Sequence, residues 1–290
     1  MHVSVILPAH NEGQNLVDTV GYVLQNSGDV DLEVIIVDDG SDDGSPAAAL
    51  ARYGTAPLRV ARGAGLGIAR ARNLGAAQAR GQALVFLDAH CYLPPGWLAP
   101  LADALAGADV GMVGPVFAGI REITTRACGI AWQDASLENV WLPPPAAVAE
   151  VPFHIGACQA MPAAVFREVG GYDAGMTRWG SEDIELCLRL WLYGYRVLAQ
   201  PDSLVFHLFR PRHPYAVDVS QALYNKLRLA LSHFDEARLA LALRSLMAYP
   251  DFSRSLARAF LDDTLSHRAC LFARRQRDMD WFCAYFGIKI

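Results

Sequence analysis

The sequence predicts an α/β fold, in which a Rossmann-like, mostly parallel central sheet is flanked by helices and followed by a C-terminal α-helical extension. Short apolar runs alternate with amphipathic segments through residues 1–114, which is the pattern of strands joined by helices. Polar residues follow directly after several of these apolar runs. Residues 216–290, in contrast, show only helical patterning.

The first strand, helix and strand set the direction of the sheet. An apolar run at residues 3–7 is stopped by Pro8, and a helix is expected from about Asn15, because apolar side chains then recur on one face. A second apolar run follows at residues 33–37. This order makes the two strands parallel, so the polar loops after them emerge at one edge of the sheet. That geometry suits a nucleotide.

Two adjacent acids, Asp38 and Asp39, end the second apolar run. A turn with helix capping, supported by Ser41 and Gly44, explains one acid at this place. It does not explain two adjacent acids after a buried strand. A ligand contact is therefore expected here.

A glycine-containing approach to a helix comes next. A weak third strand is expected at residues 58–61, followed by alternating glycines and a helix over residues 68–80. Glycines before a helix N-terminus allow a phosphate or ribose to come close to the backbone. Arg70, Arg72 and Asn73 lie in the first turns of this helix, either as ligand contacts or as surface residues.

The strand over residues 84–87 ends in an acid and an imidazole, Asp88 and His90. Alternate side chains of an extended segment point the same way, so the two can face one point at the rim of the sheet. A carboxylate and an imidazole aimed at one point form half of a site for a divalent cation. The alternative is a hydrogen-bonded Asp beside a solvated His on a loop.

The chain is less regular after this strand. A helix is expected over residues 97–105 and a strand over residues 110–116, whereas residues 117–151 show no clear period. Residues 154–158 are predicted to be a short strand that enters a turn of small residues. Gly156 in that turn allows a sugar ring to approach the backbone, or simply a tight crossing.

A second informative segment follows at residues 170–183, which are rich in glycine and aromatic residues. Ser181 is predicted to cap a helix whose first turn holds Glu182 and Asp183. Acids in a first turn stabilise the helix dipole and need no other role. At the rim of a pocket, however, a carboxylate can act as a general base towards a hydroxyl group.

The last strand and the C-terminal helices complete the prediction. A turn is expected at residues 200–203 and a short strand at residues 204–207, which places His207 at a strand end, as for Asp88. A lone His usually has a structural role, although the imidazole of His207 could also coordinate a metal ion. Helices are expected over residues 215–233, 237–247 and 252–270.

Composition narrows the class of protein. The chain has 290 residues, 53% of them hydrophobic, and no run reaches the roughly 18 apolar residues of a membrane span. The six cysteines form no CxxC pair, and the N-terminus lacks the layout of a signal peptide, so a cytoplasmic location is expected. The net charge is −5, but residues 205–290 carry +5. This positively charged part could bind a phosphate-bearing donor or an acidic partner, or associate peripherally with a membrane surface. No nucleic-acid partner is expected.

Taken together, the motifs resemble the family 2 glycosyltransferases and their relatives with the GT-A nucleotide-sugar fold. Residues 5–12 look like the first strand and loop of that family, and residues 37–41 look like its uridine-binding acid motif. Residues 87–90 stand where the family carries Asp-x-Asp, here in the Asp-x-His form of the polypeptide N-acetylgalactosaminyltransferases. Residues 171–194 and 205–215 are similar to those enzymes and to the β-1,4-galactosyltransferases.

The resemblance implies a ligand set. Asp88, His90 and His207 are expected to hold Mn²⁺ or Mg²⁺, and the cation would neutralise the diphosphate of a UDP-sugar donor. Asp39 is expected to bind the uracil or ribose. The residues expected to contact the nucleotide sugar are Pro8, Ala9, Glu12, Asp39, Arg70, Asn73, Asp88, Ala89, Gly156, Trp179 and Gly180.

The resemblance also implies a catalytic pair, Glu182 and Asp183. Polypeptide N-acetylgalactosaminyltransferases have Glu-Asn at this place and retain the anomeric configuration, whereas inverting enzymes have Glu-Asp with the Asp as base. Asp183 therefore favours inversion, and retention is the alternative. The acceptor is expected to be a peptide side chain, a saccharide or a small-molecule hydroxyl.

Three wider expectations follow. Residues 1–215 should form the catalytic domain, with a nucleotide-binding half at residues 1–114 and an acceptor half at residues 115–215. Residues 216–290 should form a helical extension, which could cap the cleft or mediate a homodimer. Two other classes of protein are disfavoured. A nucleotidyltransferase would need a basic, glycine-rich loop after the first strand, which residues 8–12 do not provide. A non-catalytic binding module would not need all of the predicted site residues.

Overall fold

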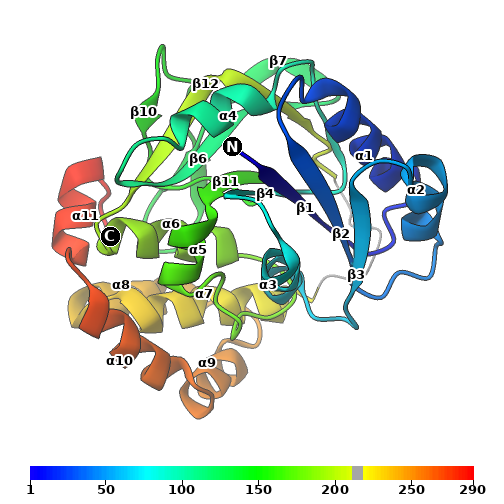
Figure 1. The fold of residues 1–290 in the computed structure, drawn as a ribbon. Coiled ribbons are helices and arrows are strands. Elements are labelled where there is room, and N and C mark those ends of the chain that lie inside the picture. Colours follow the sequence, from blue (N-terminus) through cyan, green and yellow to red (C-terminus); the bar gives the residue numbers. More distant parts are fainter. Residues whose placement is uncertain (211–217) are drawn as a thin grey trace.

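Strands and helices alternate along the N-terminal half, as the βαβ prediction requires. The computed structural model describes residues 1–210 and 218–290. The first elements are β1 (Val3–Ala9), α1 (Gln14–Asn26), β2 (Leu32–Asp38), α2 (Ser45–Tyr53), β3 (Leu58–Arg62), α3 (Ile68–Gln78) and β4 (Ala83–Leu87). Strands β3, β2, β1 and β4 lie side by side in that order and are all parallel (Figure 1). The carboxyl ends of the predicted strands therefore meet at one edge.

The second half extends this sheet with strands of both directions. Its elements are β5 (Cys91–Tyr92), α4 (Leu98–Ala104), β6 (Val110–Gly119), β7 (Glu122–Ala127), β8 (Ile130–Trp132), β9 (Asn139–Trp141), β10 (Ala149–Glu150), β11 (Cys158–Pro162), α5 (Ala163–Val169), α6 (Glu182–Leu192) and β12 (Arg196–His207). Strand β11 runs antiparallel between β4 and β6, whereas β12 runs parallel to β6. The predicted fold class is confirmed, with parallel neighbours throughout the first half and a mixed sheet beyond it.

Helices cover both faces of the sheet, because its strands are apolar on both sides. Along β1, the side chains of Val5 and Leu7 belong to a core formed with α1, α2 and α4. Ile6 points to the opposite face, where the core includes residues of α3, α5 and α6. Strands that are buried on both faces appear as continuous apolar runs, and this explains why the first strands were recognisable in the sequence.

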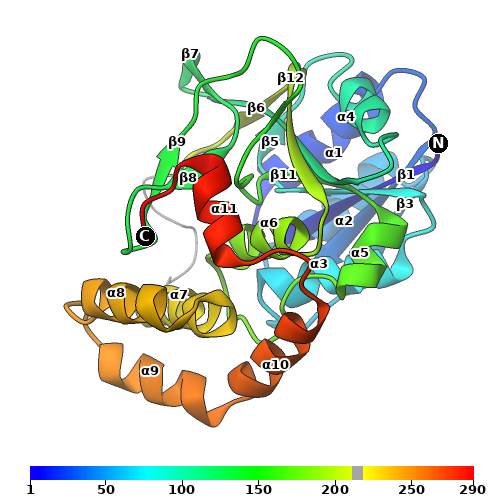
Figure 2. The same cartoon turned by 90° about the vertical axis from the view of Figure 1, so that its left-hand side faces the viewer.

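The C-terminal helices form a further layer outside the second face. They are α7 (Val219–His233), α8 (Glu236–Leu246), α9 (Phe252–Leu261), α10 (Thr264–Arg274) and α11 (Met279–Phe286). Figure 2 shows α9 and α10 lying beyond α7 and α8, while α11 returns to the sheet beside α6. In the part of the chain that the structure describes, every helix is too short or too polar to cross a membrane.

The structure corrects several predicted elements. The single helix predicted over residues 252–270 is two helices, because the backbone of Asp262 is extended and ends α9. The Asp262 carboxylate accepts a hydrogen bond from the backbone N–H of Thr264, the first residue of α10. Helix α11 was not predicted. The helix predicted over residues 215–233 corresponds to α7, and its predicted start at Tyr215 lies outside the described residues.

Two predictions in the second half of the chain are also wrong. The strand predicted at residues 154–158 begins only at Cys158, after the turn, and His154 lies buried in the core with Nε2 2.9 Å from the Leu198 carbonyl oxygen. Residues 200–203 are not a turn between strands but part of β12, where its register with β6 shifts.

Candidate active site

The predicted site residues meet in a cleft of about 870 Å³ at the carboxyl ends of β1, β2 and β4. Residues of α7 and of the segment around β8 and β9 also line it. The cleft therefore lies between these strand ends and residues from the second half of the chain. The predicted residues that line the cleft are Pro8, Ala9, Glu12, Asp39, Asp88, Ala89, His90, Gly156, Trp179, Gly180, Glu182, Asp183 and His207.

Asp88, His90 and His207 form a cluster, here called the metal cluster, in which one ligand atom from each residue lies within 4.8 Å of the others. Asp88 follows the last residue of β4, and His90 immediately precedes β5. His207 is the last residue of β12 and pairs with Cys91 of β5. Strand pairing therefore brings together residues that are far apart in the sequence. One carboxylate and two imidazoles suit a first-row divalent cation.

The contacts of the metal cluster orient its ligand atoms. His207 Nε2 lies 3.3 Å from Asp88 Oδ2, and His90 Nε2 lies 4.0 Å from the same oxygen. The other ring nitrogen of His90, Nδ1, lies 3.3 Å from Glu12 Oε1. Glu12 also forms an ion pair with Arg210. A carboxylate behind a histidine fixes the orientation of the ring, which is typical of metal sites.

The charge states of this cluster favour a cation. Burial alone would raise the pKa of Asp88, but the hydrogen bond to His207 and the charges of His90 and Arg72 lower it far below its usual range. Burial lowers the pKa of His207, against the effect of Asp88. Near neutral pH the cluster therefore offers an ionised carboxylate and an unprotonated His207, which are the forms that bind metal ions.

Arg72 of α3 joins the metal cluster to the acids of α6, and the sequence did not single it out from its neighbours. Its guanidinium is buried and donates to Glu182 Oε1 at 2.9 Å, to Asp88 Oδ1 at 3.2 Å and to the Gly156 carbonyl oxygen at 2.7 Å. The signal was its spacing of three residues from Ala69 and from Gly75, two small buried residues. Arg72 therefore lies on the inward face of α3.

Arg70 and Asn73 do not have the nucleotide-binding position that was predicted for them. Arg70 lies on the exposed side of α3, and its Nε donates to the carbonyl oxygen of Ala174. The amide of Asn73 donates to the carbonyl oxygen of Tyr172 and accepts from the N–H of the same residue. Neither side chain lines the cleft. Both hold the loop before α6 instead, because they lie on another face of the helix from Arg72.

Glu182 and Asp183, here called the acid pair, differ in their contacts. Glu182 is 3% exposed and accepts hydrogen bonds from Arg72 and from the N–H of Gly180. Asp183 is half-buried and accepts from the N–H of Gly156 at 2.6 Å and from that of Ile184. Burial raises the pKa of both carboxyl groups, and the charge of Asp183 adds to the effect on Glu182. Asp183 is thus the acid with the more accessible carboxylate, and its affinity for a proton is increased.

The predicted helix cap at Ser181 is wrong. The side chain of Ser181 makes no capping hydrogen bond, because its backbone has φ of 67° and lies in the left-handed region. At the start of α6, the side chain of Glu182 instead accepts a hydrogen bond from the backbone N–H of Gly180, two residues earlier. One carboxylate of the acid pair is therefore part of the local backbone structure.

Asp39 holds the loop between β3 and α3. Its two carboxylate oxygens accept from the N–H groups of Leu66, at 2.6 Å, and Gly67, at 2.9 Å. Gly67 has φ of +82°, and a Cβ there would lie 2.8 Å from the backbone nitrogen of Arg178. The glycines before α3 are therefore needed where this loop meets the loop before α6. Asp39 also lines the cleft.

Comparisons with known proteins agree with the motifs. Residues 4–139 match the family model described as Glycosyl transferase family 2, and residues 149–214 match the N-terminal domain of galactosyltransferase. Polypeptide N-acetylgalactosaminyltransferase 12 of Mus musculus is 35% identical over 256 residues, which are 80% of this chain and 44% of the relative. Polypeptide N-acetylgalactosaminyltransferase 10 of Homo sapiens is 33% identical over 248 residues, 78% of this chain and 41% of the relative. The chain spans less than half the length of these relatives.

Solved structures share the fold. The crystal structure of GalNAc-T7 with UDP, GalNAc and Mn²⁺ has a TM-score of 0.78 at 23% identity, and the alignment covers 99% of this chain and 56% of that chain. Mannosyltransferase PcManGT from Pyrobaculum calidifontis, in complex with GDP-Man and Mn²⁺, has a TM-score of 0.59 at 20% identity. That alignment covers 99% of this chain and 83% of the mannosyltransferase chain. The chain has the GT-A fold of these structures, and its sequence resembles the family 2 glycosyltransferases, as its motifs predicted. The relatives named above are polypeptide N-acetylgalactosaminyltransferases.

Proposed function

We propose that the chain transfers a sugar from a UDP-sugar to an acceptor nucleophile with the help of a divalent cation. The observation that carries this proposal is the metal cluster at the strand ends, joined through Arg72 to the acid pair in the same cleft. A site for the diphosphate and a site for acid–base chemistry would then be neighbours. The relatives and the Mn²⁺-containing structure of GalNAc-T7 support the same function.

The cation would be Mn²⁺ or Mg²⁺, held by Asp88, His90 and His207. Two imidazoles favour Mn²⁺, because magnesium prefers oxygen ligands. When bound, the cation would neutralise the negative charge that develops on the leaving diphosphate. Glu12 would orient His90, and the nucleoside would lie along Pro8, Ala9 and Asp39 at the ends of β1 and β2.

Asp183 would act as the general base in an inverting single displacement. The acceptor hydroxyl would give its proton to the Asp183 carboxylate while its oxygen forms a bond to the anomeric carbon. The bond from that carbon to the phosphate oxygen would break at the same time, and UDP would leave with the electron pair. The raised pKa of Asp183 supports this role, because it strengthens the carboxylate as a base.

Retention of configuration is the alternative mechanism. Its support is the identity of the relatives, which are polypeptide N-acetylgalactosaminyltransferases. In that case the acceptor would approach from the side of the departing diphosphate, and Asp183 would bind the sugar rather than take the proton. The anomeric configuration of the product distinguishes the two mechanisms directly.

The domain boundaries belong to the same proposal. Residues 1–215 would bind donor and acceptor, and residues 216–290 would close the cleft from the acceptor side. Gln221, Lys226 and Tyr249 support this division of roles, because they belong to the extension and line the cleft. The acceptor would be a peptide side chain or a saccharide.

A screen of UDP-sugars for release of UDP, with Mn²⁺ and with EDTA, tests the proposal. We expect one donor to be hydrolysed slowly without an acceptor, and EDTA to stop that reaction. A calorimetric titration with UDP and Mn²⁺ provides the binding measurement. If the chain neither binds UDP nor releases it from any donor, the proposed function is wrong.

A further inference from the structure

The loop before the acid pair has an unusual backbone. Residues 172–181, here called the acid-pair loop, connect α5 to α6 and carry Trp179 and Gly180 into the cleft. Arg178 and Ser181 have φ of 50° and 67°, in the left-handed region that side chains other than glycine disfavour. Such a conformation persists only where surrounding contacts hold it. The contacts that hold this loop therefore decide where the acid pair stands.

The side chain of Asn225, on α7, makes four of these contacts. Its Oδ1 accepts from the N–H of Thr177 at 2.8 Å. Its Nδ2 donates to the carbonyl oxygens of Thr177 at 2.8 Å, Gly180 at 2.8 Å and Trp179 at 3.3 Å. The residue is 1% exposed, so water cannot replace these bonds. Only an amide offers an acceptor and two donors at one point, and a carboxylate would face three carbonyl oxygens.

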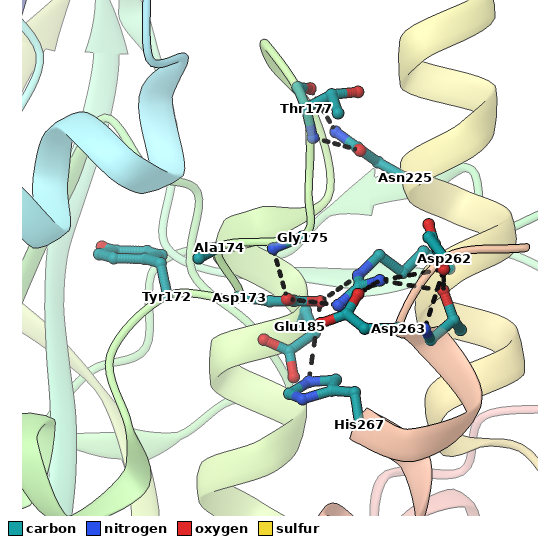
Figure 3. Close-up of polar contacts among 12 residues, drawn as sticks. Tyr172, Asp173, Ala174, Gly175, Thr177, Glu185, Asn225, Asp262, Asp263 and His267 are labelled. Atoms are coloured by element: carbon teal, nitrogen blue, oxygen red, sulfur yellow. Dashed lines mark hydrogen bonds and ion pairs between the residues drawn. The ribbon is translucent and has the colours of Figure 1, made fainter. Parts of the chain in front are cut away.

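Arg228, three residues further along α7, fixes the first part of the loop. Its guanidinium forms two hydrogen bonds to the carboxylate of Asp173, at 2.7 and 2.9 Å. Its NH1 also binds Asp263 and Thr264 at the start of α10, at 2.7 and 2.9 Å. Figure 3 shows Asp173, Gly175 and Thr177 of the loop facing Asn225 and the acids Asp262 and Asp263. The acid-pair loop is thus attached to the helical extension at both of its ends.

The other side of the loop meets the nucleotide-binding half. The carbonyl oxygen of Arg178 accepts from the N–H of Ile68 at 2.8 Å, at the start of α3. Gly67, one residue earlier, is held by Asp39. The acid-pair loop therefore lies between the extension and the loop that Asp39 organises. A displacement on the Asn225 side changes the position of Gly180, whose N–H binds Glu182 of the acid pair.

We propose that Asn225 is a positioning residue, which holds residues 177–180 so that Trp179 and the acid pair face the metal cluster. This inference rests on the proposed function, because it assigns a role in that reaction. It gives the helical extension a part in catalysis without placing any of its side chains on the reacting atoms. It predicts that the extension acts on turnover more than on binding of UDP.

The test compares Asn225→Asp with two control variants. Ser232→Ala changes a buried residue of the same helix whose Oγ has no hydrogen-bond partner in the described structure. Leu101→Ala removes a fully buried side chain from the core on the opposite face of the sheet. It lowers the stability of the protein without touching the acid-pair loop, so it controls for a loss of turnover that comes from instability alone. For each variant, turnover of the donor, affinity for UDP with Mn²⁺, melting temperature and amide exchange of residues 172–181 are measured.

We expect turnover to fall about 100-fold in the Asn225→Asp variant, because a small misplacement of catalytic groups costs that much. Affinity for UDP with Mn²⁺ should stay at the wild-type value, and amide exchange of the acid-pair loop should become faster. Both controls should keep wild-type turnover below their melting temperatures. The proposal is overturned if the Asn225 variant turns over like the wild type, or if Leu101→Ala loses as much turnover at equal stability.

Failure of the proposed function would look different. The wild-type protein itself would then neither bind UDP nor release it. Amide exchange would still decide whether Asn225 holds the loop, since that measurement needs no substrate. Unchanged exchange of residues 172–181 in the Asn225→Asp variant would overturn the positioning role by itself.

Discussion

The metal cluster and the acid pair lie in one cleft, but different parts of the structure hold them. The metal cluster stands at or beside the ends of β4, β5 and β12, so the hydrogen bonds of the sheet fix its backbone. The acid pair follows an irregular loop that is held by side chains, chiefly Asn225 and Arg228 of the helical extension. Arg72 connects the two groups.

This difference predicts how each group responds to change. A ladder of backbone hydrogen bonds does not depend on any single side chain, so the position of the metal cluster should be insensitive to most neighbouring substitutions. The acid-pair loop depends on a few buried polar side chains, and each loss leaves backbone groups without a partner. Substitutions remote from the acid pair should therefore affect turnover more readily than they affect cation binding.

The largest effect is expected for Asp183→Asn, which changes the acid pair alone. Asparagine has the same size and can still accept from the N–H of Gly156, but it cannot take a proton from the acceptor. Turnover should fall about 1,000-fold, while affinity for UDP with Mn²⁺ stays unchanged. Steady-state rates and calorimetry measure the two quantities. A variant with wild-type turnover would exclude Asp183 as the base.

Acid should weaken the packing around α6, the helix that carries the acid pair. The backbone N–H of His154 donates to the Sγ of Cys187 in α6, and burial lowers the pKa of the His154 imidazole to about 4. The unfolded chain binds this proton near pH 6.5, so the free energy of unfolding should fall as the pH drops from 6.5 to 4. The loss from this residue is about 3 kcal/mol.

Denaturant titrations at several pH values, on wild type and His154→Gln, measure this effect. Glutamine keeps a donor near the carbonyl oxygen of Leu198 but does not titrate. The variant should lose less stability than the wild type across this range. Identical pH profiles would show that His154 is not responsible.

A smaller effect is expected on the metal cluster when Glu12 becomes Gln. The imidazole of His90 loses its charged neighbour but remains in place, because strand pairing positions its backbone. Affinity for Mn²⁺ should fall about 10- to 100-fold, as for other residues behind metal ligands. Asp18→Asn, in helix α1 six residues further along the chain and away from the cleft, serves as the matched control. Equal affinities in both variants would contradict this role of Glu12.

The smallest effect is expected for Arg70→Ala. Its side chain lies on the exposed side of α3 and bonds only the carbonyl oxygen of Ala174 among the hydrogen bonds of the described residues. Affinity for UDP should not change, and the free energy of unfolding should fall by about 1 kcal/mol. A strong loss of UDP affinity would restore Arg70 as a nucleotide contact.

The sequence predicted those parts of the site that local pattern determines. Asp88 and His90 could be placed because they directly follow a buried strand, and His207 because it ends another. Arg72 was not distinguished from Arg70, because its importance comes from what lies opposite α3 rather than from its own surroundings. Its spacing of three residues from the small residues Ala69 and Gly75 indicates the inward face of the helix.

The rest could not be predicted because it depends on contacts between distant segments. Nothing near Asn225 in the sequence indicates that its amide binds a loop some 45 residues earlier. Serine is a residue type that often caps helices, but the tertiary contacts of the loop give Ser181 a left-handed backbone instead. The alternation of β4, β11 and β6 likewise follows from long-range pairing, which apolar runs alone do not specify.

Strand β12 has a consequence for how the protein is made. It ends in His207, which meets Asp88 across 119 positions of the chain. A ribosome must therefore synthesise the chain up to residue 207 before the third side chain of the metal cluster exists. The parallel strands of residues 3–87 emerge well before that point, and domains generally begin to fold from the N-terminus during synthesis. The nascent protein thus passes through a stage in which these parallel strands are present but the metal cluster is incomplete. Asn225, which contacts the acid-pair loop, is added only later.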